Sequence, residues 1–140
     1  MYLLILHLLV NSQFSIDPLG QMVAQNFMDQ LANKDHKKAA LLCNTTVNFD
    51  GQIISGQQNI EKHFETVFKA HKAPIVFKKF IFLKGDEILK KLGKLPERLG
   101  TIDFGKTILI LGRRKTGGIA VFLQEENNIS GRYRVIAITD

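Results

Sequence analysis

Apolar residues recur at helical spacing near the start of the chain. Asp17-Pro18 is a helix start, because Asp can accept hydrogen bonds from the first unpaired backbone N–H groups and Pro fits the first helical position. Beyond it, apolar residues return every three or four positions, at Leu19, Met22, Val23, Phe27 and Leu31. This spacing places them on one side of a helix. The pattern predicts a helix over residues 18–32 with that stripe buried.

A short hairpin between two more helices follows. We expect a short helix at about residues 36–43. Val47-Asn48-Phe49 then alternates in polarity, Asp50-Gly51 is a tight-turn pair, and Ile53-Ile54-Ser55 returns as a second strand. Residues 57–69 are predicted to form a third helix. Its apolar stripe consists of Ile60, Phe64, Val67 and Phe68.

The second half of the chain changes period. Four segments rich in β-branched and aromatic residues are predicted as strands, at 75–83, 107–111, 119–124 and 133–139. Turns are expected at residues 115–118 and 127–131, where Gly and Asn gather. Helices first and an antiparallel sheet afterwards form an α+β layout.

Apolar residues lie on both faces of the longer predicted strands. One face packs on the three helices, and the other also needs a cover. We expect a homo- or heterodimer through this sheet face. The alternative is that the apolar N-terminal run covers it within one chain.

A basic amphipathic stretch separates the first long strand from the second. Between Gly85 and Gly105, apolar Ile88, Leu89, Leu92 and Leu99 alternate with lysines and Arg98. We expect Asp86 to cap a short helix that Pro96 interrupts. Such a stretch either rests on the domain with solvated lysines, which we favour, or binds a membrane surface or an acidic partner.

Composition narrows the possible functions. The chain has 140 residues, enough for one domain, and a formal charge of +6. Its aromatic residues fall mostly at apolar-periodic positions, so we do not expect a nucleic-acid partner or a membrane partner. Cys43 is the only cysteine and is expected to be a small buried hydrophobe. The four histidines lack metal-ligand spacing, so we expect no metal and no cofactor.

The chain divides into an apolar extension at residues 1–16 and a domain at 17–140. The run from Met1 to Val10 is too short to span a bilayer. We expect it to pack on the domain or on a partner, and we expect a cytoplasmic or nuclear protein. If residues 1–12 are instead a signal peptide, the protein is secreted.

The hairpin resembles that of the nuclear transport factor 2-like superfamily. The residues that carry the resemblance run from Phe49-Asp50-Gly51 through Gly56-Gln57 without a gap, followed by Ile60 and Phe64 at helix core positions. Phe27-Met28 resembles the end of the first family helix. The resemblance implies a cone of three N-terminal helices packed on a strongly bent antiparallel sheet. It extends over about residues 19–83 and, more weakly, 107–140.

The resemblance also implies a function. In nuclear transport factor 2 this hairpin borders an apolar pocket for an aromatic side chain of the GDP-bound Ran GTPase. By position, Phe49 and Phe27 belong to such a pocket and Asp50 meets a basic residue of the partner. The resemblance thus favours a non-catalytic protein-binding module with a Ran-like GTPase or an export receptor as partner. The alternative to a binding role is that Phe49 is a core residue and Asp50 only forms the turn.

An enzyme is the rival interpretation. The superfamily includes SnoaL-like cyclases, dehydratases and ketosteroid isomerase, whose cones hold small molecules. Phe49 and Phe27 stand at positions similar to those where the isomerase has proton-transferring groups, so that chemistry is not expected. If the chain is an enzyme, its weak candidates are Asp103, pointing into the cone, and His63, at its rim.

Overall fold

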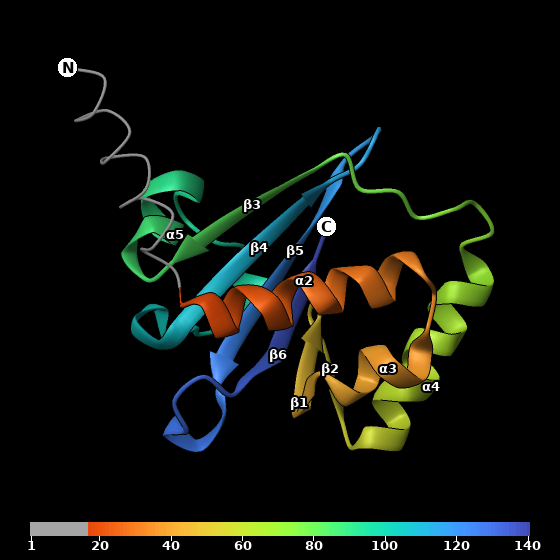
Figure 1. Cartoon of the computed structure of the whole chain (residues 1–140), viewed down its shortest axis with the longest axis horizontal. Helices are drawn as coiled ribbons and strands as arrows, with labels where there is room; N and C mark the ends of the chain where they lie inside the picture. Colours follow the sequence, from red (N-terminus) through yellow and green to blue (C-terminus); the bar gives the residue numbers. More distant parts are fainter. Residues whose placement is uncertain (1–16) are drawn as a thin grey trace.

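Three helices cover one face of a sheet in the computed structural model, which describes residues 17–140. The predicted extension at 1–16 and its signal-peptide alternative lie outside these residues. The helices are α2 (Pro18–Ala32), α3 (His36–Leu41) and α4 (Gln57–Ala70). Figure 1 shows α2 lying across the sheet, with α3 and α4 grouped beside its β1–β2 edge. The predicted α+β layout with N-terminal helices is confirmed.

The sheet has six strands in the order β2-β1-β6-β5-β4-β3. Neighbouring strands are antiparallel except β1 and β6, which are parallel and join the two halves of the chain. The expectation of a purely antiparallel sheet is therefore corrected at this one pair. The strands are β1 (Cys43–Phe49), β2 (Gln52–Ser55), β3 (Lys79–Lys84), β4 (Thr107–Arg113), β5 (Gly118–Glu125) and β6 (Tyr133–Thr139).

Helix α2 begins as predicted and buries Phe27 and Leu31 as predicted, but the rest of its buried stripe differs. Asp17 Oδ1 accepts a hydrogen bond from the Leu19 N–H at 2.9 Å, and Pro18 is the first helical residue. Leu19 and Met22, predicted as buried, are 54% and 68% exposed. The buried stripe instead includes small residues, which hydrophobicity alone does not single out, and allows a close approach to the sheet. It consists of Gly20, Ala24, Phe27, Met28 and Leu31.

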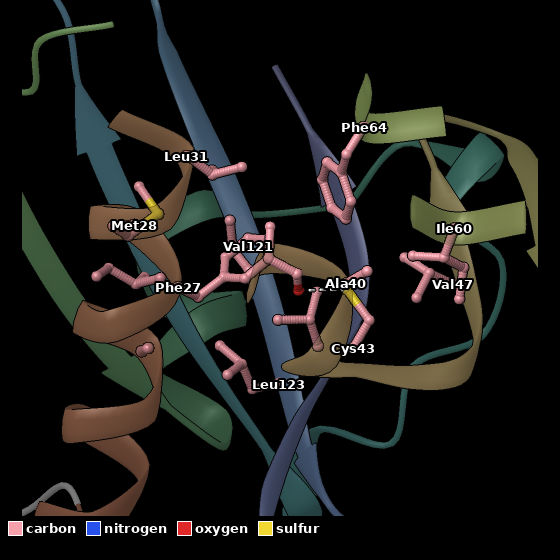
Figure 2. Close-up of a cluster of buried hydrophobic side chains, with 14 of the residues drawn as sticks. Phe27, Met28, Leu31, Ala40, Cys43, Val47, Ile60, Phe64, Val121 and Leu123 are labelled. Carbon is pink, nitrogen blue, oxygen red and sulfur yellow. Dashed lines mark hydrogen bonds between the residues drawn. The ribbon is translucent and has the colours of Figure 1, made fainter. Parts of the chain in front are cut away.

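A first core lies between the three helices and the sheet. Figure 2 shows Phe27 and Met28 of α2, Ile60 and Phe64 of α4, and Val121 of β5 around it. Gly112 of β4 faces this core, where an added Cβ would lie 2.4 Å from Met28 Cε. Cys43 donates its thiol hydrogen to the Ala39 carbonyl at 3.5 Å, and burial raises the pKa of this thiol. Cys43 is thus the inert buried residue that we expected.

A second core lies on the opposite face of the sheet, and the chain covers it itself. The covering segment consists of α5 (Asp86–Leu92), η1 (Glu97–Leu99) and η2 (Phe104–Lys106). Ile88, Leu99 and Ile102 of this stretch pack on one row of strand residues, Leu83, Leu109, Phe122 and Ala137. A partner or the N-terminal run had been predicted to cover this face. A dimer therefore stays a prediction, and the need to cover this sheet face no longer supports it.

Several boundaries differ from those predicted, for local reasons. Strand β3 begins at Lys79 rather than residue 75, because its partner β4 ends at Arg113, directly opposite Lys79. Asp86 is not the cap of α5, whose N-cap is Gly85, and instead pairs with Lys90 at 3.5 Å. The helix ends at Leu92, followed by its C-cap Gly93 with a φ of +70°, before Pro96 is reached. No helix within residues 17–140 is long and apolar enough to span a membrane.

The cover formed by α5 depends on one anchor residue. Ile88 is fully buried, whereas its neighbour Leu89 is 45% exposed. We expect Ile88→Ala to lower the free energy of unfolding by about 2–5 kcal/mol, because it leaves a cavity over the sheet. Leu89→Ala, the matched control, should change it by less than about 0.5 kcal/mol. Urea unfolding measures both, and equal effects would mean that α5 does not cover the sheet in solution.

Candidate functional site

A cavity of about 330 Å³ opens between α4, the β1–β2 turn and the ends of β5 and β6. Its walls come from parts of the chain that are far apart in the sequence and meet only in the folded domain. Most of its lining is apolar, and its polar groups are few. The lining residues used below are Phe49, Asp50, His63, Phe64, Val67, Phe68, His71, Arg114, Ile119, Ile138 and Thr139.

Stacked aromatic rings form one wall of this cavity. The Phe64 ring lies edge-on to Phe49, with centroids 5.3 Å apart, and stacks on Phe68 at 5.7 Å. Phe27 contacts Phe64 from below at 6.0 Å but is fully buried and does not line the cavity. The structure therefore brings Phe49 to the predicted pocket and leaves Phe27 in the core beneath it. Contacts of this kind fix the rings in place, so the pocket is preformed.

Asp50 lies at the mouth and is held by two other parts of the chain. It occupies the β1–β2 turn with φ of 53°, and its Oδ1 accepts hydrogen bonds from the Thr139 hydroxyl and from Arg98 Nε. The Thr139 hydrogen bond, then that of Arg98, holds the pKa of Asp50 below its usual range. The Asn48 side-chain amide donates to the Arg98 carbonyl at 3.0 Å, which fixes η1 beside the turn.

His63 is a half-buried polar group that packs against the aromatic wall. Its ring lies 4.2 Å from that of Phe49, tilted by 44°. Burial lowers the pKa of His63, so the imidazole is neutral near pH 7. Within residues 17–140 its side chain has no hydrogen-bond partner. Its position beside the apolar stripe of α4 agrees with the predicted rim placement.

His71 and Arg114 close another side of the mouth. Arg114 Nη2 and His71 Nε2 are 3.2 Å apart, and because a guanidinium can only donate, His71 Nε2 is the acceptor. Arg114 follows the last residue of β4, directly before the turn predicted at residues 115–118. The β4–β5 hairpin is present as predicted, but Arg114 is half-buried and turns towards the cavity.

Asp103 is not brought to this cavity. Its Oδ1 accepts a hydrogen bond from the Gly105 N–H at 3.1 Å, so it caps η2 on the other side of the sheet, and it is exposed. The expectation that it points into the cone is therefore wrong, because a turn-forming role satisfies it locally. Among residues 17–140, no three His, Cys, Asp or Glu side chains are placed to hold a metal ion.

Two residues of the site, Arg98 and Thr139, were not predicted from the sequence. Arg98 lies 48 positions from Asp50, and Thr139 lies 89 positions away. Thr139 follows the alternation of the last strand and gives no separate signal. Arg98 sits in the amphipathic stretch among other cations, and nothing in its spacing distinguishes it from them. The pocket can bind an apolar group, with one anchored carboxylate and one neutral imidazole available for polar contacts.

Similarity to known proteins is confined to structure. No protein-family model matches this sequence, and no curated protein matches it. A nuclear transport factor 2-like protein of unknown function from Pseudomonas putida has a TM-score of 0.50 at 12% identity, covering 84% of this chain and 80% of that one. Aln2 from a Streptomyces species has a TM-score of 0.49 at 11% identity, covering 85% of this chain and 84% of that one.

A protein of unknown function from Mycobacterium tuberculosis has a TM-score of 0.49 at 10% identity, covering 92% of this chain and 72% of that one. We base the fold assignment on the Pseudomonas protein together with the order of the elements. At such identities the likeness concerns the fold alone. The chain has the nuclear transport factor 2-like fold.

Proposed function

We propose that this chain is a non-catalytic binding module whose pocket receives an apolar or aromatic side chain of a protein partner. The observation that carries the proposal is that the pocket has an apolar wall and a polar mouth. The polar groups of the mouth already form hydrogen bonds with other side chains of this chain. Asp50 is held by Thr139 and Arg98, and Arg114 is held by His71. Side chains held by such hydrogen bonds can orient a bound group, but they are poorly placed to transfer protons to or from it.

The size and rim of the pocket agree with this proposal. About 330 Å³ lies at the low end of roughly 300–1,000 Å³ for small-molecule sites, and suits a single aromatic group. Val67 on the rim is 43% exposed, so apolar surface continues outward from the pocket. A partner that inserts one side chain would cover this rim as well, as anchor residues of interfaces do.

The mouth suggests the chemistry beside the anchor. Asp50 Oδ2 accepts no hydrogen bond from residues 17–140, so this oxygen is available to a basic residue of the partner. The low pKa keeps the carboxylate ionised at neutral pH. By resemblance, the partners to test are a Ran-like GTPase and an export receptor, and the compartment is the cytoplasm or the nucleus.

One observation favours a second function, a small-molecule carrier or enzyme. His63 is a neutral imidazole that faces the apolar wall without a partner in the described part of the chain. Such a group can accept a proton or a hydrogen bond from a bound molecule. In that case His63 is the candidate base, because Asp103 lies elsewhere.

A charge at the rim tests the pocket without disturbing the core. Val67→Lys places an ammonium group at the mouth, and we expect it to weaken partner binding by about tenfold or more. Thr66→Lys is the matched control, since Thr66 is exposed on α4 and does not line the cavity. Pull-down and calorimetric titration with GDP-loaded Ran and with export-receptor domains provide the measurement.

If neither protein binds the unmodified chain, the transport assignment is wrong. If both rim variants bind equally well, the partner uses another surface. Stabilisation of the unmodified chain by small apolar molecules, lost in His63→Gln, would favour the second function.

The lowered pKa of His63 predicts that stability depends on pH. Because the folded state disfavours the protonated ring, the unfolded state binds more protons below its own pKa of about 6.5. The free energy of unfolding therefore carries no penalty from His63 above about pH 6.5. It falls as the pH is lowered from there towards the pKa of His63 in the folded state. We expect His63→Gln to reduce the loss of unfolding free energy between pH 7.5 and 5.5, measured by urea unfolding.

His71→Gln, at the other histidine that lines the cavity, serves as a separate control. Asp50 stays ionised over the same interval, since its pKa is lowered. Identical pH dependence in the unmodified chain and in His63→Gln would show that the ring is solvated in the folded protein.

A further inference from the structure

A groove of about 580 Å³ lies on the face of the sheet opposite the helices. One wall is the stretch from Leu92 to Leu99, and the other is the β4–β5 hairpin around Arg113 and Lys115. The floor is a row of residues that lie directly opposite one another across the strands. Ile81 pairs with Leu111, Leu111 with Ala120, and Ala120 with Thr139.

The position of this row explains why it is open. The covering segment packs on the next row, Leu83, Leu109, Phe122 and Ala137, two residues further along each strand. Side chains of one face recur every second residue, so the two rows are neighbours. Ile81, Leu111 and Ala120 are only half-buried, whereas Leu109 and Phe122 are buried. The segment thus leaves an apolar strip uncovered beside it.

Cations gather at one end of this strip. Lys79 lies directly opposite Arg113 in the next row of the same face, and both are exposed. Like charges in directly opposed positions destabilise a sheet. The side chains of Lys79, Arg113, Lys94 and Lys115 form no hydrogen bond or ion pair with residues 17–140. The only acidic residue among those lining the groove is Asp140.

We propose that the groove binds a single amphipathic organic anion, with its apolar body on the Ile81–Leu111–Ala120 row and its anionic head beside Lys79 and Arg113. Charge complementarity supports this occupant, because an anion relieves the repulsion between two cations that lack partners. Strands are about 4.8 Å apart, so a row across four strands extends about 14 Å, which suits an acyl chain of medium length.

This site is separate from the proposed protein-binding pocket. The two cavities share four lining residues at one end of the sheet, Arg114, Ile119, Thr139 and Asp140, but the rest of their linings lies on opposite faces of the sheet. The aromatic wall of the first cavity, from Phe49 to Phe68, does not reach the groove. The two proposals therefore stand or fall independently.

The test uses the full chain and a fluorescent fatty acid, 11-(dansylamino)undecanoic acid, with displacement by dodecanoate or by uncharged dodecanol. We expect saturable binding of one probe per chain, displaced by dodecanoate far better than by dodecanol. Arg113→Gln and Lys79→Gln should each weaken binding by about threefold or more. Lys62→Gln, the same change on an exposed lysine of α4, should leave it unaltered.

Filling the strip gives an independent arm. Ala120→Leu should abolish probe binding, while circular dichroism and the melting temperature report whether the fold is retained. Equal displacement by dodecanol, or unaltered binding in both charge variants, would overturn the proposal. So would binding seen only with vesicles of anionic phospholipid, or a dimer in sedimentation analysis that Ala120→Leu disrupts, since the strip would then be a membrane or protein interface.

Discussion

The fold depends on a sheet whose central strands carry apolar side chains on both faces. Strands β4 and β5 alternate between residues that face the helices, such as Ile110 and Val121, and residues that face the covering segment, such as Leu109 and Phe122. Neither face can remain open to water without a large apolar surface being exposed. Every other element is placed by this need, with three helices on one side and residues 86–106 on the other.

In a sheet that is apolar on both faces, hydrophobicity does not decide which set of side chains faces the helices. The fit between packed side chains decides it. A slip of one residue would exchange the two sets of side chains, with little change in hydrophobicity. Gly112 fixes the choice, because Met28 and Phe77 occupy the space that a side chain would need on the helix side. The bulge at Ile136 has a similar effect on β6, since Val135 pairs with Leu123 and Ala137 with Phe122. Packing detail therefore decides what the polarity pattern leaves open.

This division explains what the sequence could reveal. Local signals gave the bounds of α2, the Asp50-Gly51 turn and the last strand, because caps, turn residues and alternation act over a few positions. The hairpin resemblance located Phe49 and Asp50 at the cavity. The partners of Asp50 could not be found, since Arg98 is brought there by a segment whose packing is tertiary. Met22 and Leu19 were misplaced because size and polarity do not tell which side of α2 can approach the sheet.

The parallel pairing of β1 with β6 has a consequence for how the protein folds. Residues 43–49 and 133–139 are about 90 positions apart, and β6 alone connects the β1–β2 hairpin to the other three strands. An isolated two-stranded hairpin is marginal in water, so β1 and β2 gain lasting support from the sheet only after β6 has joined them. Closing so long a loop is entropically costly and slows folding. The cavity mouth, which needs Thr139 beside Asp50, is accordingly expected to be among the last parts of the molecule to form.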